Sequence, residues 1–157
     1  MVSVIGLNKM IIYGINIPNV SLTNLDLLHY VQELNIPNFR GVFMRDTLPH
    51  NPHRKECGIV NLNTSKENGS HWVAYWKNGK NRIYFDSFGQ ITPEEIQKYL
   101  KTRSEFIENS SCIKINTDIV QAENTNICGH LCLYVLKSLT DGKTFQDTLN
   151  TLQHYNV

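Results

Sequence analysis

Two β-rich runs separated by a short turn lie in the middle of the chain, and together they limit its fold more than any other feature. Residues 72–76 and 82–86 are rich in aromatic and β-branched side chains, and Asn78-Gly79 lies between them. Asn-Gly between two such runs is a strong signal for a β-hairpin. We therefore predict an antiparallel pair of strands with its turn centred on Asn78-Gly79.

This hairpin places two titratable residues beside each other. His71 precedes the first run and Asp86 ends the second, and each lies seven or eight residues from the turn. Residues at equal distances from a hairpin turn face each other, within reach of a side-chain hydrogen bond. Taken alone, the histidine reads as a surface residue and the aspartate before Ser-Phe-Gly as a turn former, so it is their pairing that indicates a site.

A helix is predicted before this region. Ser21 or Thr23 can cap it, and it should stop before Pro37. Its apolar positions, spaced by three residues, are Leu25, Leu28, Val31 and Leu34.

The strongest helix signal begins at Cys128. A polar turn at residues 124–126 precedes it, and residues 128–139 carry apolar side chains at positions 128, 131, 132, 135, 136 and 139. These positions form one stripe along a helix, which predicts that the helix is buried. Cys128 would then stand at the N-terminus of a buried helix.

The order of predicted elements indicates an α+β domain, with a mostly antiparallel central sheet flanked by helices. The remaining predictions are a strand or peripheral arm at 10–17, a loop or edge segment at 41–57, strands at 58–63 and 112–116, a continuation of the latter at 119–120, a helix capped by Thr92 and a final helix from about Thr144.

Length and composition favour a single domain over residues 1–157, with residues 1–20 as an N-terminal arm and residues 21–157 as the core. The net charge of +1 predicts no strong attraction to nucleic acid, and no apolar run approaches the length that spans a membrane. The N-terminus lacks the pattern of a signal peptide, and the four cysteines show no dense disulfide framework. We therefore expect a monomeric intracellular protein with free thiols, not a secreted one.

Cys128 is a candidate nucleophile because of this predicted position. The free N–H groups and the positive dipole end of a helix N-terminus favour a thiolate and can face an oxyanion. Gly129 keeps the first turn small, so a substrate backbone could approach it, and Gln121, seven residues before Cys128, carries an amide that could donate to the same oxyanion. Taken alone, Cys128 would more often be a small core residue and Gln121 a solvated loop residue.

The motifs taken together resemble those of the adenovirus protease (adenain) family, in the clan that also holds the SUMO-specific and NEDD8-specific proteases. The resemblance runs from about Ser21 to Leu139, and the seven-residue gap from Gln121 to Cys128 favours the adenoviral branch. The motifs that carry it are Gly69-Ser70-His71-Trp72, Phe85-Asp86-Ser87-Phe88-Gly89, Gln121 and Cys128-Gly129.

The resemblance implies a role for each of these positions. Adenoviral enzymes usually carry glutamate at the third position, whereas the SUMO proteases carry aspartate, and either carboxylate can orient an imidazole. The implied roles are nucleophile for Cys128, general base for His71, orienting acid for Asp86 and oxyanion donor for Gln121, with Trp72, Gly69, Ser70 and Gly129 along the substrate groove.

The resemblance also implies substrates and a setting. Family substrates carry small residues, commonly Gly-Gly, at the scissile bond, and some members of the clan cleave ubiquitin-like proteins. The role that the resemblance implies is maturation of a viral polyprotein or of capsid proteins. It would take place in the host cytoplasm, the nucleus or the virion. No cofactor is required by the sequence. The resemblance implies two possible activators. One is a peptide linked by a disulfide to a cysteine near the position of Cys112. The other is DNA, for which the net charge gives no support.

Other classes fit less well. The papain family places its cysteine before its histidine, the reverse of the order here. A structural zinc site wants four ligands in paired spacing, which Cys57, Cys112, Cys128 and Cys132 do not provide. A catalytically silent module that binds glycine-rich tails would not need Gln121 and Cys128 together. A protease of ubiquitin-like proteins would share the chemistry and differ in its substrate.

Overall fold

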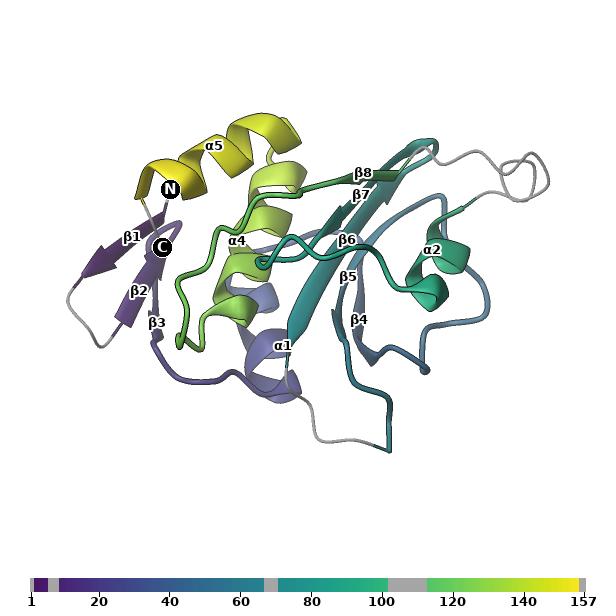
Figure 1. Cartoon of the computed structure of the whole chain (residues 1–157), viewed down its shortest axis with the longest axis horizontal. Coiled ribbons are helices and arrows are strands. Elements are labelled where there is room, and N and C mark those ends of the chain that lie inside the picture. Colours follow the sequence, from purple (N-terminus) through teal and green to yellow (C-terminus); the bar gives the residue numbers. More distant parts are fainter. Residues whose placement is uncertain (1, 6–8, 67–70, 102–112, 156–157) are drawn as a thin grey trace.

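The computed structural model describes residues 2–5, 9–66, 71–101 and 113–155 (Figure 1). Within these ranges the chain forms eight strands and four helices. In chain order they are β1 (Val2–Ile5), β2 (Lys9–Ile12), β3 (Ile15–Pro18), α1 (Asn24–Glu33), β4 (Phe39–Met44), β5 (Lys55–Asn61), β6 (Trp72–Asn78), β7 (Asn81–Phe85), α2 (Glu94–Leu100), β8 (Ile113–Ile115), α4 (Cys128–Thr140) and α5 (Phe145–Tyr155).

The main sheet has five strands in the order β4-β5-β6-β7-β8. Its centre, β5 to β7, is antiparallel, and the edge strands β4 and β8 each run parallel to their neighbour. The predicted α+β class is confirmed. The segment 41–57 holds most of edge strand β4 and the beginning of β5, and the predicted continuation at 119–120 is wrong because β8 ends at Ile115.

The predicted hairpin is formed by β6 and β7, but its turn lies one residue later than expected. Asn78 pairs with Asn81, so residues 79–80 are central, and Gly79 has φ +63°, a conformation that favours glycine. The pairing is therefore shifted by two residues, and His71 and Asp86 are diagonal neighbours instead of opposite ones. Because side chains alternate with a period of two, an even shift keeps both on the same face.

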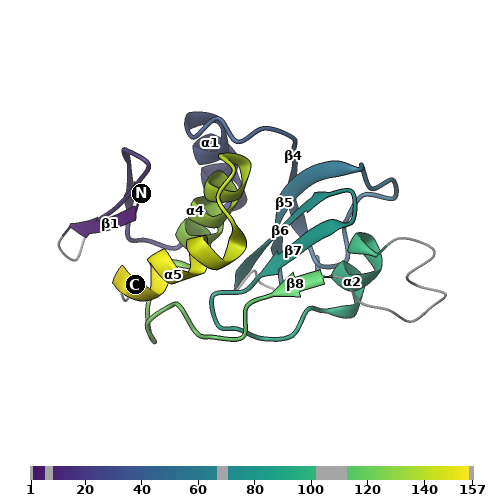
Figure 2. The same cartoon turned by 90° about the horizontal axis from the view of Figure 1, so that it is seen from above.

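The main sheet has a core on each face. Ile59 and Ala74 belong to the core on the side of α4, whereas the adjacent Val60 and Tyr75 belong to a smaller core with α2. Helix α4 lies between the five-stranded sheet and the N-terminal strands (Figures 1 and 2). It is buried on every side from Gly129 to Leu136, a wider burial than the predicted stripe.

Helix α1 begins as predicted and turns a different face inward. Thr23 is its N-cap, and a capping box with Asp26 satisfies the first turn. The predicted stripe is wrong at Leu25, which is 71% exposed, and at Leu28, which is 39% exposed. A spacing of three drifts around a helix with 3.6 residues per turn, so the buried face follows spacings of four and three. The buried residues are Leu27, Val31 and Leu34.

The start of α2 also differs from the prediction. Pro93 occupies the N-cap position and no side chain caps the helix, so Thr92 is not the cap. The Thr92 carbonyl instead accepts a hydrogen bond from the Gln97 side chain at 2.8 Å.

A buried carboxylate joins the edge of the sheet to its centre on the α2 side. One oxygen of Glu56 accepts hydrogen bonds from the hydroxyls of Tyr75 and Tyr99, and the other accepts from Arg40 and the His53 backbone. All its main acceptor positions are filled, which is the condition for burying a charge. The network holds β4, the strand of Arg40, against β5.

The first 20 residues contribute to the core of the rest of the chain. Strands β1, β2 and β3 form an antiparallel sheet, and Met10, Ile12 and Ile17 are fully buried in the same core as α4. The Tyr13 ring stacks on Tyr134 of α4, with centroids 5.7 Å apart. The predicted arm is therefore packed against the helix that begins at Cys128.

We expect Ile12→Ala to lower the free energy of unfolding by about 2–5 kcal/mol, because it removes a fully buried side chain and leaves a cavity. Ile91→Ala is the matched control, since Ile91 is 81% exposed, and should change stability by no more than about 0.5 kcal/mol. Urea denaturation measures both. Equal midpoints for the two variants would show that the N-terminal strands do not pack as described.

Candidate active site

Cys128 opens onto a cavity of about 610 Å³ at the start of α4. The cavity walls come from the segment before α1, from β4, from the start of β6 and from the loop that precedes α4. His71, Trp72, Phe88 and Gln121 line it together with Cys128. The structure thus brings residues from widely separated parts of the chain to one cavity.

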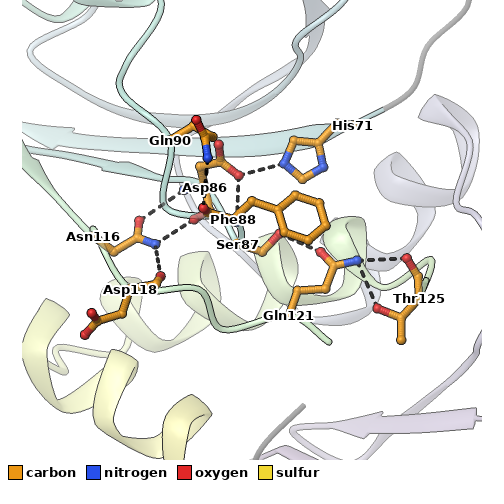
Figure 3. Close-up of polar contacts among 9 residues, drawn as sticks. All are labelled: His71, Asp86, Ser87, Phe88, Gln90, Asn116, Asp118, Gln121 and Thr125. Carbon is orange, nitrogen blue, oxygen red and sulfur yellow. Dashed lines mark hydrogen bonds and ion pairs between the residues drawn. The ribbon is translucent and has the colours of Figure 1, made fainter. Parts of the chain in front are cut away.

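The first contact in the site joins His71 to Asp86. Nε2 of His71 lies 2.7 Å from Oδ1 of Asp86, whose side chain is buried (Figure 3). A carboxylate only accepts hydrogen bonds, so Nε2 carries the hydrogen of this bond. His71 and Cys128 also act on each other's pKa, and Nδ1 is the ring nitrogen left to face the thiol.

These contacts shift the proton affinities of both partners. Burial by itself would lower the pKa of His71, but the hydrogen bonds and charges of Asp86 and Cys128 raise it to about 9. Burial would raise the pKa of Cys128, but His71 and the backbone N–H groups of Trp72 and Gly129 bring it below the ordinary thiol value. The two shifts together favour a thiolate–imidazolium pair.

The loop after β7 holds Asp86 by turn chemistry. Oδ1 of Asp86 also accepts from the Phe88 backbone N–H at 2.9 Å, and the Gly89 N–H donates to the Asp86 carbonyl at 2.8 Å. Gly89 has φ +66°, and a Cβ there would stand 2.5 Å from the Thr117 carbonyl oxygen, so only glycine fits. Asp86 is therefore both the turn former and the partner of His71, two readings that the sequence offered as alternatives.

The Phe88 side chain covers His71. The phenyl and imidazole rings are stacked, with centroids 4.9 Å apart (Figure 3). The ring shields one face of the imidazole from water and can stabilise its charged form.

The Gln121 amide is held on both sides. Oε1 accepts from the Ser87 hydroxyl at 2.6 Å, and Nε2 donates to the backbone carbonyl and to Oγ1 of Thr125 at 2.9 and 3.1 Å (Figure 3). Because a carbonyl only accepts, the amide nitrogen must face Thr125. Gln121 lines the cavity, but both of these donated hydrogen bonds go to Thr125, and its role as oxyanion donor stays a prediction.

The other predicted groove residues have different surroundings. Trp72 lines the cavity, and its Nε1 donates to the Leu22 carbonyl at 2.9 Å. Gly129 is buried, and a Cβ there would stand 3.3 Å from Leu27 and Trp72 side-chain atoms, so its small size lets α1 and Trp72 pack on the first turn of α4. Its part in binding substrate stays a prediction. Gly69, Ser70 and Cys112 lie outside the described residues.

Sequence reasoning missed three residues of this site. Phe88 covers the histidine, Thr125 holds Gln121, and Asn116 binds the backbone of Asp86. Phe88 lies in the motif at residues 85–89, in which only Asp86 was predicted to have a role. Thr125 and Asn116 are ordinary polar residues of a turn and of a strand end, so the sequence carried no separate signal for them.

A buried carboxylate, an imidazole and a thiol at a helix N-terminus, brought together at one cavity of an α+β fold, define the class of cysteine peptidases. Residues 39–154 match the sequence model of the adenovirus endoprotease family. The chain belongs to that family.

Two solved structures of the ASFV pS273R protease have a similar fold. One superposes with a TM-score of 0.57 at 16% identity and covers 87% of this chain and 66% of that chain. The selenomethionine form gives 0.55 at 16% identity, with 85% and 63% covered. The chain thus spans about two thirds of the length of that protease, and at this identity the likeness concerns the fold.

Within the described residues, none of the helices is long and apolar enough to cross a membrane. The same ranges contain no group of three or more His, Cys, Asp or Glu side chains that could hold a metal ion.

We expect Cys128 to react with iodoacetamide at a lower pH than an ordinary thiol does. A free thiol is half ionised near pH ~8.5, whereas the lowered pKa of Cys128 keeps its thiolate populated as the pH falls below that value. His71→Ala removes the main interaction that lowers this pKa and leaves burial, which raises it, so the half-maximal rate should move to higher pH.

Peptide mapping by mass spectrometry follows Cys128 separately from the other cysteines. His29→Ala is the control, because the His29 side chain is 60% exposed on α1 and lies apart from the cavity. A wild-type rate that rises only around the ordinary thiol pKa would contradict the thiolate–imidazolium pair.

Proposed function

We propose that the chain is a cysteine endopeptidase that cleaves at small, glycine-containing sites. The observation that carries this proposal is the hydrogen bond of buried Asp86 to His71, together with the mutual pKa effects of His71 and Cys128 on the wall of one open cavity. A cysteine that only filled the core would need neither a lowered pKa nor an accessible position. Cys132, one turn further along α4, is fully buried, and burial first of all raises its pKa well above the ordinary value.

The proposed reaction is acyl transfer. The Cys128 thiolate attacks the carbonyl carbon of the scissile bond, and the backbone N–H of Cys128 together with Gln121 stabilises the oxyanion. The His71 imidazolium donates its proton to the leaving amine as the C–N bond breaks, which leaves a thioester on Cys128. His71 then takes a proton from water, whose oxygen attacks the thioester and releases the acid and the Cys128 thiolate, which restores the thiolate–imidazolium pair. Asp86 keeps the imidazole in the orientation that both steps require.

The cavity supports the proposed substrate class. Trp72 and Phe88 are bulky residues that line it beside Cys128, which favours a substrate backbone with small side chains at the scissile bond. Leu22 and residues 42–44 give another part of the same cavity an apolar lining. That part suits an apolar side chain some residues away from the glycines.

The biological role belongs to the same proposal. Membership of the adenovirus endoprotease family supports maturation of viral proteins inside the host cell or the virion. Aspartate at the third position, as in SUMO proteases, supports ubiquitin-like proteins as the alternative substrates. We further propose that the chain acts as a monomer without a metal, and that neither DNA nor an added peptide is required.

We expect wild-type protein to cleave a fluorogenic Leu-x-Gly-Gly peptide, and Cys128→Ala to abolish the cleavage. His71→Ala should lower kcat on the order of 10²-fold or more, the usual contribution of a general acid–base residue. His29→Ala, a surface histidine substitution, should leave kcat unchanged.

The same assay can distinguish the alternative substrates and test whether an activator is needed. Cleavage of a ubiquitin-like precursor in preference to the peptide would select the alternative substrate. Activity that appears only with DNA or with a cysteine-bearing peptide would contradict the proposed independence of activators. No cleavage under any condition, with Cys128 unreactive toward alkylation, would favour a binding module.

A further inference from the structure

The backbone of Asp86 lies beyond the regular pairing of the sheet. Strand β7 ends at Phe85, and the pairing of β7 with β8 ends with Tyr84 opposite Ile115. Asp86 is nevertheless completely buried, so its N–H and carbonyl need partners from elsewhere. Both groups find a partner in one side chain, and the carbonyl also accepts from the Gly89 N–H.

That side chain is Asn116, the first residue after β8. Its Oδ1 accepts from the Asp86 N–H at 3.1 Å, and its Nδ2 donates to the Asp86 carbonyl at 2.6 Å (Figure 3). Nδ2 also lies 3.3 Å from the Asp118 carbonyl oxygen. Asn116 is itself buried, with 3% exposed.

An amide side chain is suited to this position because it carries the donor and the acceptor of a peptide group. Asn116 therefore binds the β7 side of the sheet beyond the last β7–β8 pair, with its side chain in place of its backbone. A carboxylate would offer only acceptors, and an apolar residue would leave the Asp86 N–H buried without a partner and the carbonyl with the Gly89 N–H alone. Such groups are costly to bury, so the amide fixes the Asp86 backbone strongly.

Further contacts join the same two loops. The Val120 N–H donates to the Ser87 carbonyl at 2.9 Å, and Gly89 packs closely on the Thr117 carbonyl. The loop that carries Asp86 is therefore attached to the loop that follows β8. The placement of the Asp86 carboxylate against His71 depends on that attachment.

We propose that Asn116 is a positioning residue of the peptidase site: its amide holds the main chain of Asp86, and through it the carboxylate that orients His71. The catalytic consequence rests on the proposed function, whereas the placement of His71 can be tested without any substrate. Asn116 acts through Asp86, and none of its hydrogen bonds reaches Cys128 or His71.

The direct test is an NMR titration of the His71 ring in wild-type protein and in Asn116→Ala. The titratable groups that act on this ring are Asp86 after β7 and Cys128 at the start of α4. If Asn116→Ala displaces the Asp86 carboxylate, the pKa of His71 should fall from about 9 toward the ordinary value of about 6.5. With an active peptidase, kcat should fall by roughly 10-fold or more, while KM stays within about 2-fold, since positioning affects the chemical step.

Leu149→Ala is the matched control for packing. Leu149 is buried and lines the same small cavity of about 100 Å³ as Asn116, but it offers Asp86 no hydrogen bond. It should lower the melting temperature and leave the His71 titration unchanged. If Asn116→Ala does not fold, Asn116→Ser replaces it, because a hydroxyl is too short to bridge the N–H and the carbonyl of Asp86.

The outcomes separate this inference from the proposed function. An unchanged His71 titration in a folded Asn116 variant would overturn it, and so would an equal shift in Leu149→Ala. If wild-type protein cleaves no peptide, the proposed function fails, and the titration still decides the role of Asn116.

Discussion

The site depends on the hydrogen bond between His71 and Asp86, and that bond depends on the hairpin of β6 and β7. The two residues stand just outside the paired strands, where the register of the hairpin brings them together at 2.7 Å. An unpaired carboxylate would be very costly to bury, so the burial of Asp86 is tolerable only with its partners in place. The same bond contributes, with the Asp86 charge and Cys128, to raising the pKa of His71 to about 9, which favours the imidazolium beside the Cys128 thiolate.

The helix that carries Cys128 is fixed from several sides. Strands of the N-terminal sheet, α1, α5 and β6 all surround α4, and His130 of α4 binds the Pro18 carbonyl at 2.7 Å. Gly129 lets Trp72 and α1 close on its first turn. The nucleophile is thus on the most buried helix of the described chain, at the end that reaches the surface cavity. A rigid scaffold of this kind suits a site whose reacting atoms must keep their mutual distances.

Several features of the fold could be predicted because they depend on local patterns. The Asn-Gly turn predicted the hairpin, the apolar run after Cys128 predicted α4 from its first residue, and Thr23 predicted the cap of α1. The two-residue slip of the hairpin and the outward face of Leu25 could not be predicted, because neighbouring strands and helices select the register and the buried face. The local strand and helix propensities of these residues are the same for either hairpin register and for either buried face of α1.

The sequence by itself determined which residue types stand near one another along the chain, and hence the hairpin, the α4 helix, the Cys128–His71–Asp86 set and the resemblance that links them. Only the tertiary structure decided which polar group receives each hydrogen bond. The link of Asn116 to Asp86 spans 30 residues, that of Ser87 to Gln121 spans 34, and that of His130 to Pro18 spans 112. The physical reason is that a turn or a helix period repeats within a few residues, whereas a buried polar group takes whichever partner the packed chain brings within reach.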